Sequence, residues 1–189
     1  MQSSIEIAVK NMVCNRCIKV VKEELTKNNI NFTFVDLGKI YISKPFTNQE
    51  SDALKQILKK EGFDLVEDKE AIIVNKIKAL VIKNIHQGKE KPQHQNFSDY
   101  LTSKIGMEYS HMSKLFSEIE GNTIEHYIIE QRIERAKEFI IYNELTLSQI
   151  SYELNYSSPQ HLSRQFKQIT GLTPTAFKKI GERIKLDNI

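Results

Sequence analysis

The chain has 189 residues, 40% of them hydrophobic, and a formal net charge of +3 at pH 7. This length permits one large domain or two small ones, with enough apolar residues for real cores. No apolar run is long enough to span a membrane and the N-terminus lacks the hydrophobic core of a signal peptide, so we expect a cytoplasmic protein whose two cysteines are reduced.

Residues 1–68 alternate strand-like and helix-like patterns. In chain order we expect a strand at 5–9, a helix near 20–25, a hairpin of 32–35 and 40–42, a helix at 53–58 and a strand at 63–66. This βαββαβ order predicts the α+β fold class, with a ferredoxin-like N-terminal domain of two helices on an antiparallel sheet.

Two cysteines lie between the first strand and the first helix, in the motif Met12-x-Cys14-x-x-Cys17. Soft thiolates favour Cu(I), and the start of a helix together with Arg16 is expected to lower the thiol pKa. The two thiols are therefore candidate ligands of a soft metal ion.

This motif, with Gly62-Phe63 opening the last strand, resembles the heavy-metal-associated domain of copper chaperones and copper pumps over about residues 3–68. The resemblance implies that Cys14 and Cys17 are paired ligands of monovalent copper, with Met12 beneath the loop. Asn11 stands where that family usually has glycine.

Other roles for the cysteines remain open. A closed zinc site needs four ligands, and every histidine lies at position 86 or later, which disfavours zinc within this domain. A redox pair is an alternative, although the βαββαβ order is not that of thioredoxin. In a third reading the domain is a folded scaffold or senses another ligand, and its cysteines are idle.

Residues 69–96 are predicted as a linker helix followed by a flexible segment. The helix has a strong apolar stripe at helical spacing, made of Ile72, Ile73, Val74, Ile77, Val81 and Ile85. This stripe can pack on either domain or pair with its copy in a second chain as a homodimer. Residues 88–96 are polar and predict a loop.

The most informative feature is a repeat: residues 111–123 reappear, fifty positions on, as residues 161–173. Each copy has apolar residues at helical intervals and ends in glycine, Gly121 and Gly171. A shorter apolar helix precedes each copy, at residues 98–105 and 146–154. Two helix-turn-helix units are therefore predicted.

The outer faces of the repeated helices are polar. Gln160 and Arg164 lie one helical turn apart and can form paired hydrogen bonds to adenine and guanine edges. The basic surplus also falls in this part of the chain, since residues 1–70 hold 11 basic and 11 acidic residues and residues 71–189 hold 16 and 13. The predicted DNA-binding residues are Ser110, His111, Ser113, Lys114, Ser158, Gln160, His161, Ser163, Arg164 and Lys167. A purely structural helical repeat is the alternative.

Residues 132–140, 145–150 and 166–177 resemble the AraC-type transcription regulators in order and spacing, and the match runs from about Phe97 to Lys179. The resemblance implies one DNA-binding domain, residues 97–189, with two helix-turn-helix units joined by one long helix. Asn155 stands where the family usually has glycine. We expect the second unit to supply most of the specificity, because Glu118 and Glu120 in the first unit repel the DNA backbone.

These patterns together predict a DNA-binding transcription regulator with a sensor domain for a soft metal such as Cu(I). A metal-trafficking or redox protein is the alternative from another class. An enzyme is disfavoured, because the sequence contains no evident nucleophile and base pairing, glycine-rich phosphate loop or carboxylate pair.

Overall fold

The structure, a computed structural model, describes residues 5–66, 68–88, 91 and 95–186, with side chains to residue 180. The chain forms two compact units. The first unit contains the N-terminal region together with residues 95–121, and the second unit begins at Asn122. The boundary between the units therefore falls between the two predicted helix-turn-helix units.

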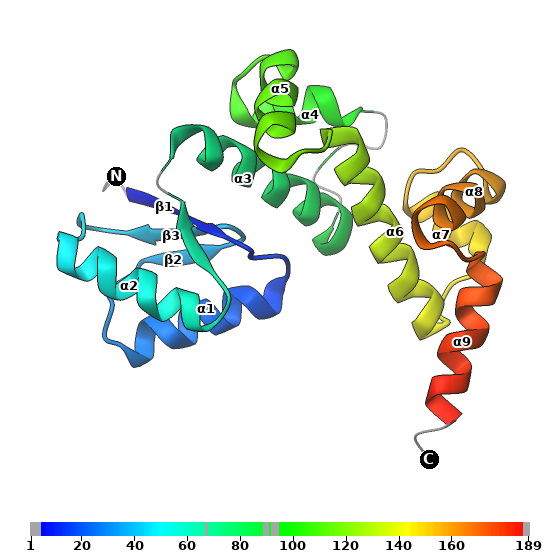
Figure 1. The fold of residues 1–189 in the computed structure, drawn as a ribbon, viewed down its shortest axis with the longest axis horizontal. Coiled ribbons are helices and arrows are strands. Elements are labelled where there is room, and N and C mark those ends of the chain that lie inside the picture. Colours follow the sequence, from blue (N-terminus) through cyan, green and yellow to red (C-terminus); the bar gives the residue numbers. More distant parts are fainter. Residues whose placement is uncertain (1–4, 67, 89–90, 92–94, 187–189) are drawn as a thin grey trace. The chain divides into compact units, whose positions relative to one another are not determined.

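The first unit begins with a four-stranded antiparallel sheet and two helices (Figure 1). The elements are β1 (Ile5–Lys10), α1 (Asn15–Lys27), β2 (Phe34–Asp36), β3 (Lys39–Ile42), α2 (Asn48–Lys60) and β4 (Asp64–Val66). The strand order is β2-β3-β1-β4. An N-terminal antiparallel sheet followed by an all-helical region confirms the predicted α+β class.

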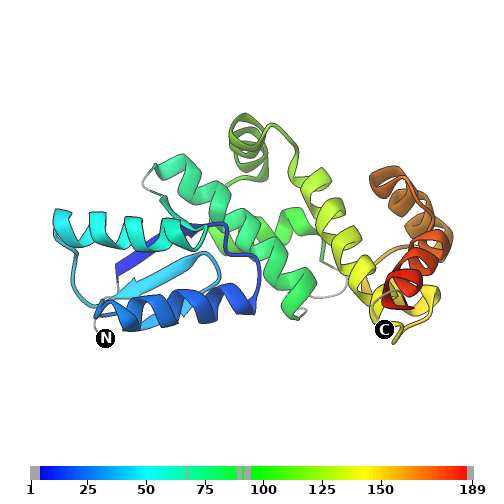
Figure 2. The same cartoon turned by 60° about the horizontal axis from the view of Figure 1, so that its bottom comes forward.

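Alternation along β1 assigns its side chains to the two faces of the sheet. Ile7 pairs with Ile40 and Val9 with Leu65, so these apolar residues share one face of the sheet. Both α1 and α2 lie on the same side of the sheet (Figures 1 and 2). Ala8 points to the opposite face, yet it is also buried. A further element must therefore cover that second face.

This element is α3 (Lys69–Ile82), which continues into a π-helical turn, η1 (Lys83–Gln87). It contacts β1 on one side and α4 (Phe97–Ile105) and α5 (Tyr109–Glu120) on the other. Three residues of its predicted apolar stripe, Val74, Ile77 and Val81, are buried, and so is the adjacent Ile82. The stripe residues Ile72, Ile73 and Ile85 are half-buried. The linker helix thus packs on elements of its own chain, which is one of the two predicted arrangements, and a homodimer through this helix stays a prediction.

Most of the predicted flexible segment lies outside the described residues, namely 89–90 and 92–94. The predicted domain boundaries at residues 68 and 96 remain predictions, because one compact unit can hold more than one domain. No helix in the described ranges is both long and apolar enough to cross a bilayer.

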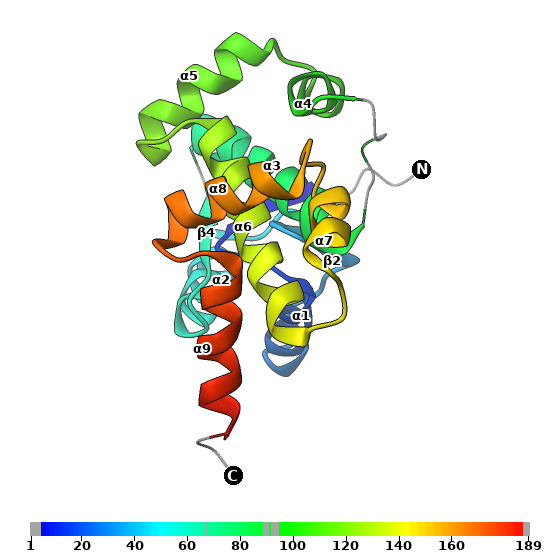
Figure 3. The ribbon, with the colours of Figure 1, turned by 90° about the vertical axis from the view of Figure 1, so that its right-hand side faces the viewer.

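The second unit consists of helices (Figures 1 and 3). They are α6 (Ile124–Tyr142), α7 (Leu147–Glu153), α8 (Pro159–Thr170) and α9 (Pro174–Leu186). Their packed core includes Ile133, Ala136, Ile140, Ile150, Leu154, Leu162 and Phe166. The short helices α7 and α8 lie where the sequence predicts the second helix-turn-helix, and the long α6 precedes them.

The helix ends follow the local chemistry of the sequence. Thr146 and Gln149 form a reciprocal capping box at the start of α7. Gly106, Gly121 and Gly171 take the left-handed conformation after α4, α5 and α8. Gly106 lies in the turn between α4 and α5, whereas Gly121 and Gly171 end the second helix of each helix-turn-helix pair.

Candidate nucleic-acid interface and thiol pair

The position of α8 in the second unit is set by its two ends and its buried face. The Ser158 side chain caps the first turn by accepting a hydrogen bond from the His161 amide at 3.1 Å. Pro159 follows at the first helical position. Leu162 and Phe166 are fully buried, and the Phe166 ring packs edge-on against Phe177 with centroids 5.4 Å apart. The helix is therefore held rigidly, with a defined outer face.

That outer face carries Gln160, Arg164 and Lys167, all exposed and spaced at helical intervals. No residue of α8 is acidic. In the part of the chain that the structure describes, neither Arg164 nor Lys167 has an ion-pair partner. The face thus presents one carboxamide and two cations whose hydrogen-bonding groups are available to base edges and phosphates.

The other predicted residues of α8 have local structural roles. Ser163 Oγ donates to the Pro159 carbonyl at 2.8 Å, and Ser158 is the cap. The His161 ring is half-buried, and its Nδ1 lies 3.1 Å from Ser157 Oγ. These groups shape the start of α8, and their contacts with DNA stay predictions.

Sequence reasoning missed two residues that support this helix. The buried Tyr156 ring packs edge-on against His161, with centroids 5.3 Å apart, and the Arg132 guanidinium lies 5.7 Å from the Tyr156 ring centre. Burial raises the pKa of Tyr156 and lowers that of Arg132. The one signal in the sequence is position, because Arg132 lies four residues from both Ile128 and Ala136 on the apolar side of α6.

In the first unit, α5 is the equivalent helix. Ser110, His111 and Lys114 are exposed and Ser113 is half-buried. The Lys114 ammonium lies 3.9 Å from the Glu118 carboxylate, which offsets its charge. This surface is less basic than that of α8.

Glu120 differs from the expectation. Its carboxylate accepts a hydrogen bond from Lys78 of α3 at 2.8 Å, and both side chains are about three-quarters buried, at 24% and 25% exposure. It therefore holds α5 against α3 rather than standing free to repel a DNA backbone, and only Glu118 keeps that predicted role.

The turn between α7 and α8 depends on Asn155, which takes a left-handed φ of 57°. Asparagine tolerates this conformation better than other residues with a Cβ, which explains its presence where the resembled family usually has glycine. We expect Asn155→Ala to lower the free energy of unfolding by about 1 kcal/mol, measured by urea denaturation. Asn155→Gly is the control, and it should cost less, because glycine adopts this φ without strain. Equal stability of the alanine variant would contradict the role of the turn.

The two thiols lie together at the start of α1. Cys14 is the N-cap residue, and the Cys14 and Cys17 sulfurs are 3.6 Å apart, within hydrogen-bond distance of each other and not joined by a disulfide. Met12, two residues before Cys14, is buried at 4% exposure. Asn11 adopts a φ of 72°, again a glycine-like conformation, and its Nδ2 donates to the Gly62 carbonyl at 3.0 Å. The loop is thus tied to the turn before β4.

The surroundings of Cys14 favour the thiolate. Partial burial raises the pKa of the Cys14 thiol, but interactions with the Cys17 amide and side chain, the Arg16 amide and the Arg16 charge outweigh it, so the net pKa is lowered. No group of three or more His, Cys, Asp and Glu residues gathers around a common point in the described ranges. A pair of thiolates fits a soft monovalent ion that accepts two sulfur ligands better than it fits a four-ligand zinc site.

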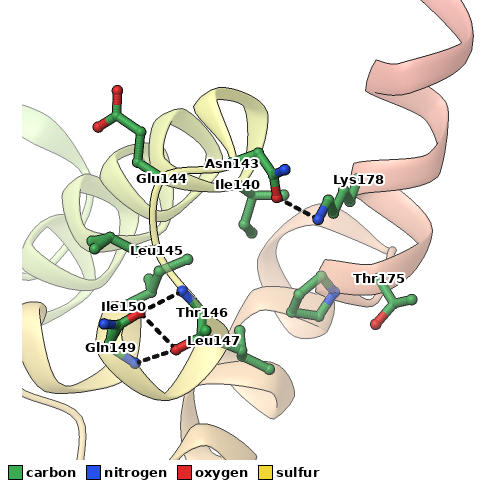
Figure 4. A pocket seen from close by; sticks show the side chains of 11 residues that line it. Ile140, Asn143, Glu144, Leu145, Thr146, Leu147, Gln149, Ile150, Thr175 and Lys178 are labelled. Carbon is green, nitrogen blue, oxygen red and sulfur yellow. Dashed lines mark hydrogen bonds between the residues drawn. The ribbon is translucent and has the colours of Figure 1, made fainter.

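A cavity of about 440 Å³ lies where the end of α6 meets the starts of α7 and α9 (Figure 4). Most polar side chains that line the cavity are hydrogen-bonded to one another. Lys178 donates to the Asn143 side chain, and Thr146 and Gln149 are joined in the capping box. Glu144 and Thr175 are the remaining polar side chains of the lining. The cavity therefore offers a ligand few convergent polar groups.

Residues 101–180 match the family described as the helix-turn-helix domain. The chain is 33% identical over 78 residues to an uncharacterized HTH-type transcriptional regulator of Staphylococcus aureus strain MSSA476, covering 41% of this chain and 10% of that protein. It is 27% identical over 88 residues to the xylose operon regulatory protein of Escherichia coli K12, covering 47% of this chain and 22% of the relative. The chain spans less than a quarter of the length of these curated relatives.

Two solved structures share the fold. The C-terminal domain of AraT, a response regulator from Geobacillus stearothermophilus, has a TM-score of 0.51 at 17% identity, covering 60% of this chain and 88% of that one. A DNA-binding transcriptional dual regulator from Escherichia coli K-12 has a TM-score of 0.50 at 19% identity, covering 59% and 93%. At 17% and 19% sequence identity, both matches show a likeness of fold alone.

Proposed function

We propose that this protein, whose C-terminal region is a helix-turn-helix DNA-binding domain of the AraC type, is a sequence-specific transcription regulator. The observation that carries the proposal is the outer face of α8. Gln160 and Arg164 project together from a helix that is capped and anchored, and Lys167, which has no ion-pair partner among the described residues, adds a cation one turn further. Carboxamide and guanidinium groups at this spacing suit base edges in the major groove, and the lysine suits a phosphate.

In this proposal the first helix-turn-helix assists. Ser110, His111, Ser113 and Lys114 can contact a second stretch of DNA, with the Lys114 charge reduced by Glu118. Such contacts are mostly with the backbone, so they add affinity and little sequence preference.

We further infer that the N-terminal region is a ferredoxin-like domain of the heavy-metal-associated kind that holds a soft metal ion such as Cu(I). The strand order β2-β3-β1-β4 with two helices on one face supports the fold, and the adjacent Cys14 and Cys17 thiols, together with the buried Met12, support the ligand. Cys14 and Cys17 would hold the ion through their thiolates, and the ion would supply a soft metal–sulfur centre at the start of α1. Arg16 and the helix amides would stabilise those thiolates.

Selection from a library of randomised double-stranded oligonucleotides tests DNA recognition. The full chain should enrich one sequence pattern, and its affinity should fall steeply as salt rises. An Arg164→Ala, Gln160→Ala variant should retain salt-dependent binding but lose enrichment. Enrichment by that variant equal to that of the unchanged chain would contradict the assignment, and a lack of any DNA binding would favour a trafficking or redox role for the thiol pair.

A further inference from the structure

We propose that α3 transmits the state of the thiol pair to the first helix-turn-helix, and not to the second, by joining the N-terminal sheet to α5. This inference rests on the proposed function, because it concerns how that function is regulated. It follows from what each side of α3 contacts within the first unit.

On the sheet side, Asn75 is the central contact. Its Nδ2 donates to the Val9 carbonyl at 3.0 Å and to the Gly38 carbonyl at 3.3 Å, so both amide hydrogens are used. Gly38, with a φ of +75°, permits this close approach, since a Cβ there would lie 3.2 Å from Asn75 Nδ2 and 3.4 Å from Ala79 Cβ. Asn75 therefore pins α3 to the end of β1 and to the β2–β3 turn.

The end of β1 leads directly into the thiol loop. After Val9 and Lys10, the left-handed turn at Asn11 brings the chain to Met12 and Cys14. A change that displaces this loop must therefore act on the strand end that Asn75 holds.

On the other side, α3 holds the first helix-turn-helix. Lys78, one turn after Asn75, forms the 2.8 Å ion pair with Glu120 at the end of α5. Between the sheet, α3 and α5 lies a small cavity of about 30 Å³, lined in part by Lys10, Asn75, Lys78 and Glu120. One cavity is thus bordered by the strand end, the helix and the candidate recognition helix.

The second helix-turn-helix belongs to the other compact unit and has its own core around Phe166. A ligand changes an equilibrium only through a difference in its affinity for the two states. A signal that enters through β1 and α3 thus alters the arrangement of α5, while α8 keeps the packing that orients Gln160 and Arg164. Regulation then adjusts affinity and leaves the sequence preference intact.

Hydrogen exchange of the full chain, without DNA, tests this. One equivalent of Cu(I) should change the exchange rates of α5 amides by about threefold or more and leave α8 amides unchanged. Asn75→Leu removes the two hydrogen bonds to the sheet and leaves the Lys78–Glu120 ion pair in place. It should itself raise α5 exchange by about tenfold, the effect of losing one to two ordinary hydrogen bonds. It should also remove the response to Cu(I). Lys78→Met provides a second variant with the same loss of response.

Lys137→Met is the matched control, because it breaks a 2.6 Å lysine–glutamate pair on α6 of the second unit. This variant should keep the α5 response. Unchanged α5 exchange, in a chain whose ultraviolet absorption shows bound Cu(I)-thiolate, overturns the proposal. If Cu(I) does not bind, the metal assignment fails. In that case, equal α5 exchange in Asn75→Leu and in the unchanged chain overturns the proposed coupling of the sheet to α5 through α3. Failure of DNA recognition is seen separately, in the oligonucleotide selection.

Discussion

Replacing Arg164 with alanine should weaken binding to the selected DNA site by about 1–3 kcal/mol and relax the preference at one base pair. The reason is geometric, because Arg164 is exposed on a helix fixed by Leu162 and Phe166 and has no ion-pair partner among the described residues. Because the guanidinium is not engaged by an ion-pair partner in the described part of the chain, both of its parallel donors are available to one guanine. Affinities for a series of single-base-changed duplexes, at fixed salt, measure the effect.

Lys114→Ala in α5 is the companion variant. Its ammonium is exposed and lies 3.9 Å from Glu118, so its loss should weaken all duplexes by a smaller and more uniform amount. Loss of sequence preference in Lys114→Ala and its retention in Arg164→Ala would reverse the roles of the two helix-turn-helix units.

Replacing both Cys14 and Cys17 with serine should abolish tight Cu(I) binding. The loss should exceed the roughly 10–100-fold that removal of an outer-shell partner costs, because both proposed ligands disappear. The fold should survive, since the two sulfurs are only half-buried and serine keeps their size. Competition against a colorimetric Cu(I) chelator measures the affinity, and circular dichroism checks the fold.

Val13→Ser is the control for the same loop. Val13 is 55% exposed and lies between Met12 and Cys14, so the change alters the loop without removing a thiol. It should retain Cu(I) affinity. Equal affinity in the double serine variant and the unchanged chain would exclude the thiol pair as the copper site, leaving a redox or scaffold role for this domain.

Much of the local structure could be predicted because it depends on neighbours in sequence. The capping box of Thr146 and Gln149, the Ser158 cap and the left-handed Gly171 are all decided within one helical turn. The repeat located α5 and α8, because each copy carries apolar residues at helical spacing. Asn11 and Asn155 were noted only as departures from glycine, and their positive φ values show why asparagine serves at each turn.

Contacts between distant segments could not be predicted. Glu120 looked like a free carboxylate on α5, but its partner Lys78 is 42 positions away. Nothing in the sequence indicates that the Arg132 guanidinium lies over the Tyr156 ring. Periodicity reports which face of a helix is buried, but it does not report what buries it.

The linker helix shows which features depend on local sequence and which depend on tertiary contacts. The sequence by itself determined the helix, its apolar stripe and the order of elements on either side, because spacing and composition specify these locally. Only the tertiary structure decided that the stripe packs on the chain's own sheet and on α4 and α5. The reason is that an apolar stripe is stabilised by any complementary apolar surface, and the choice among surfaces depends on shape and on single long-range contacts such as Asn75 with the Val9 and Gly38 carbonyls.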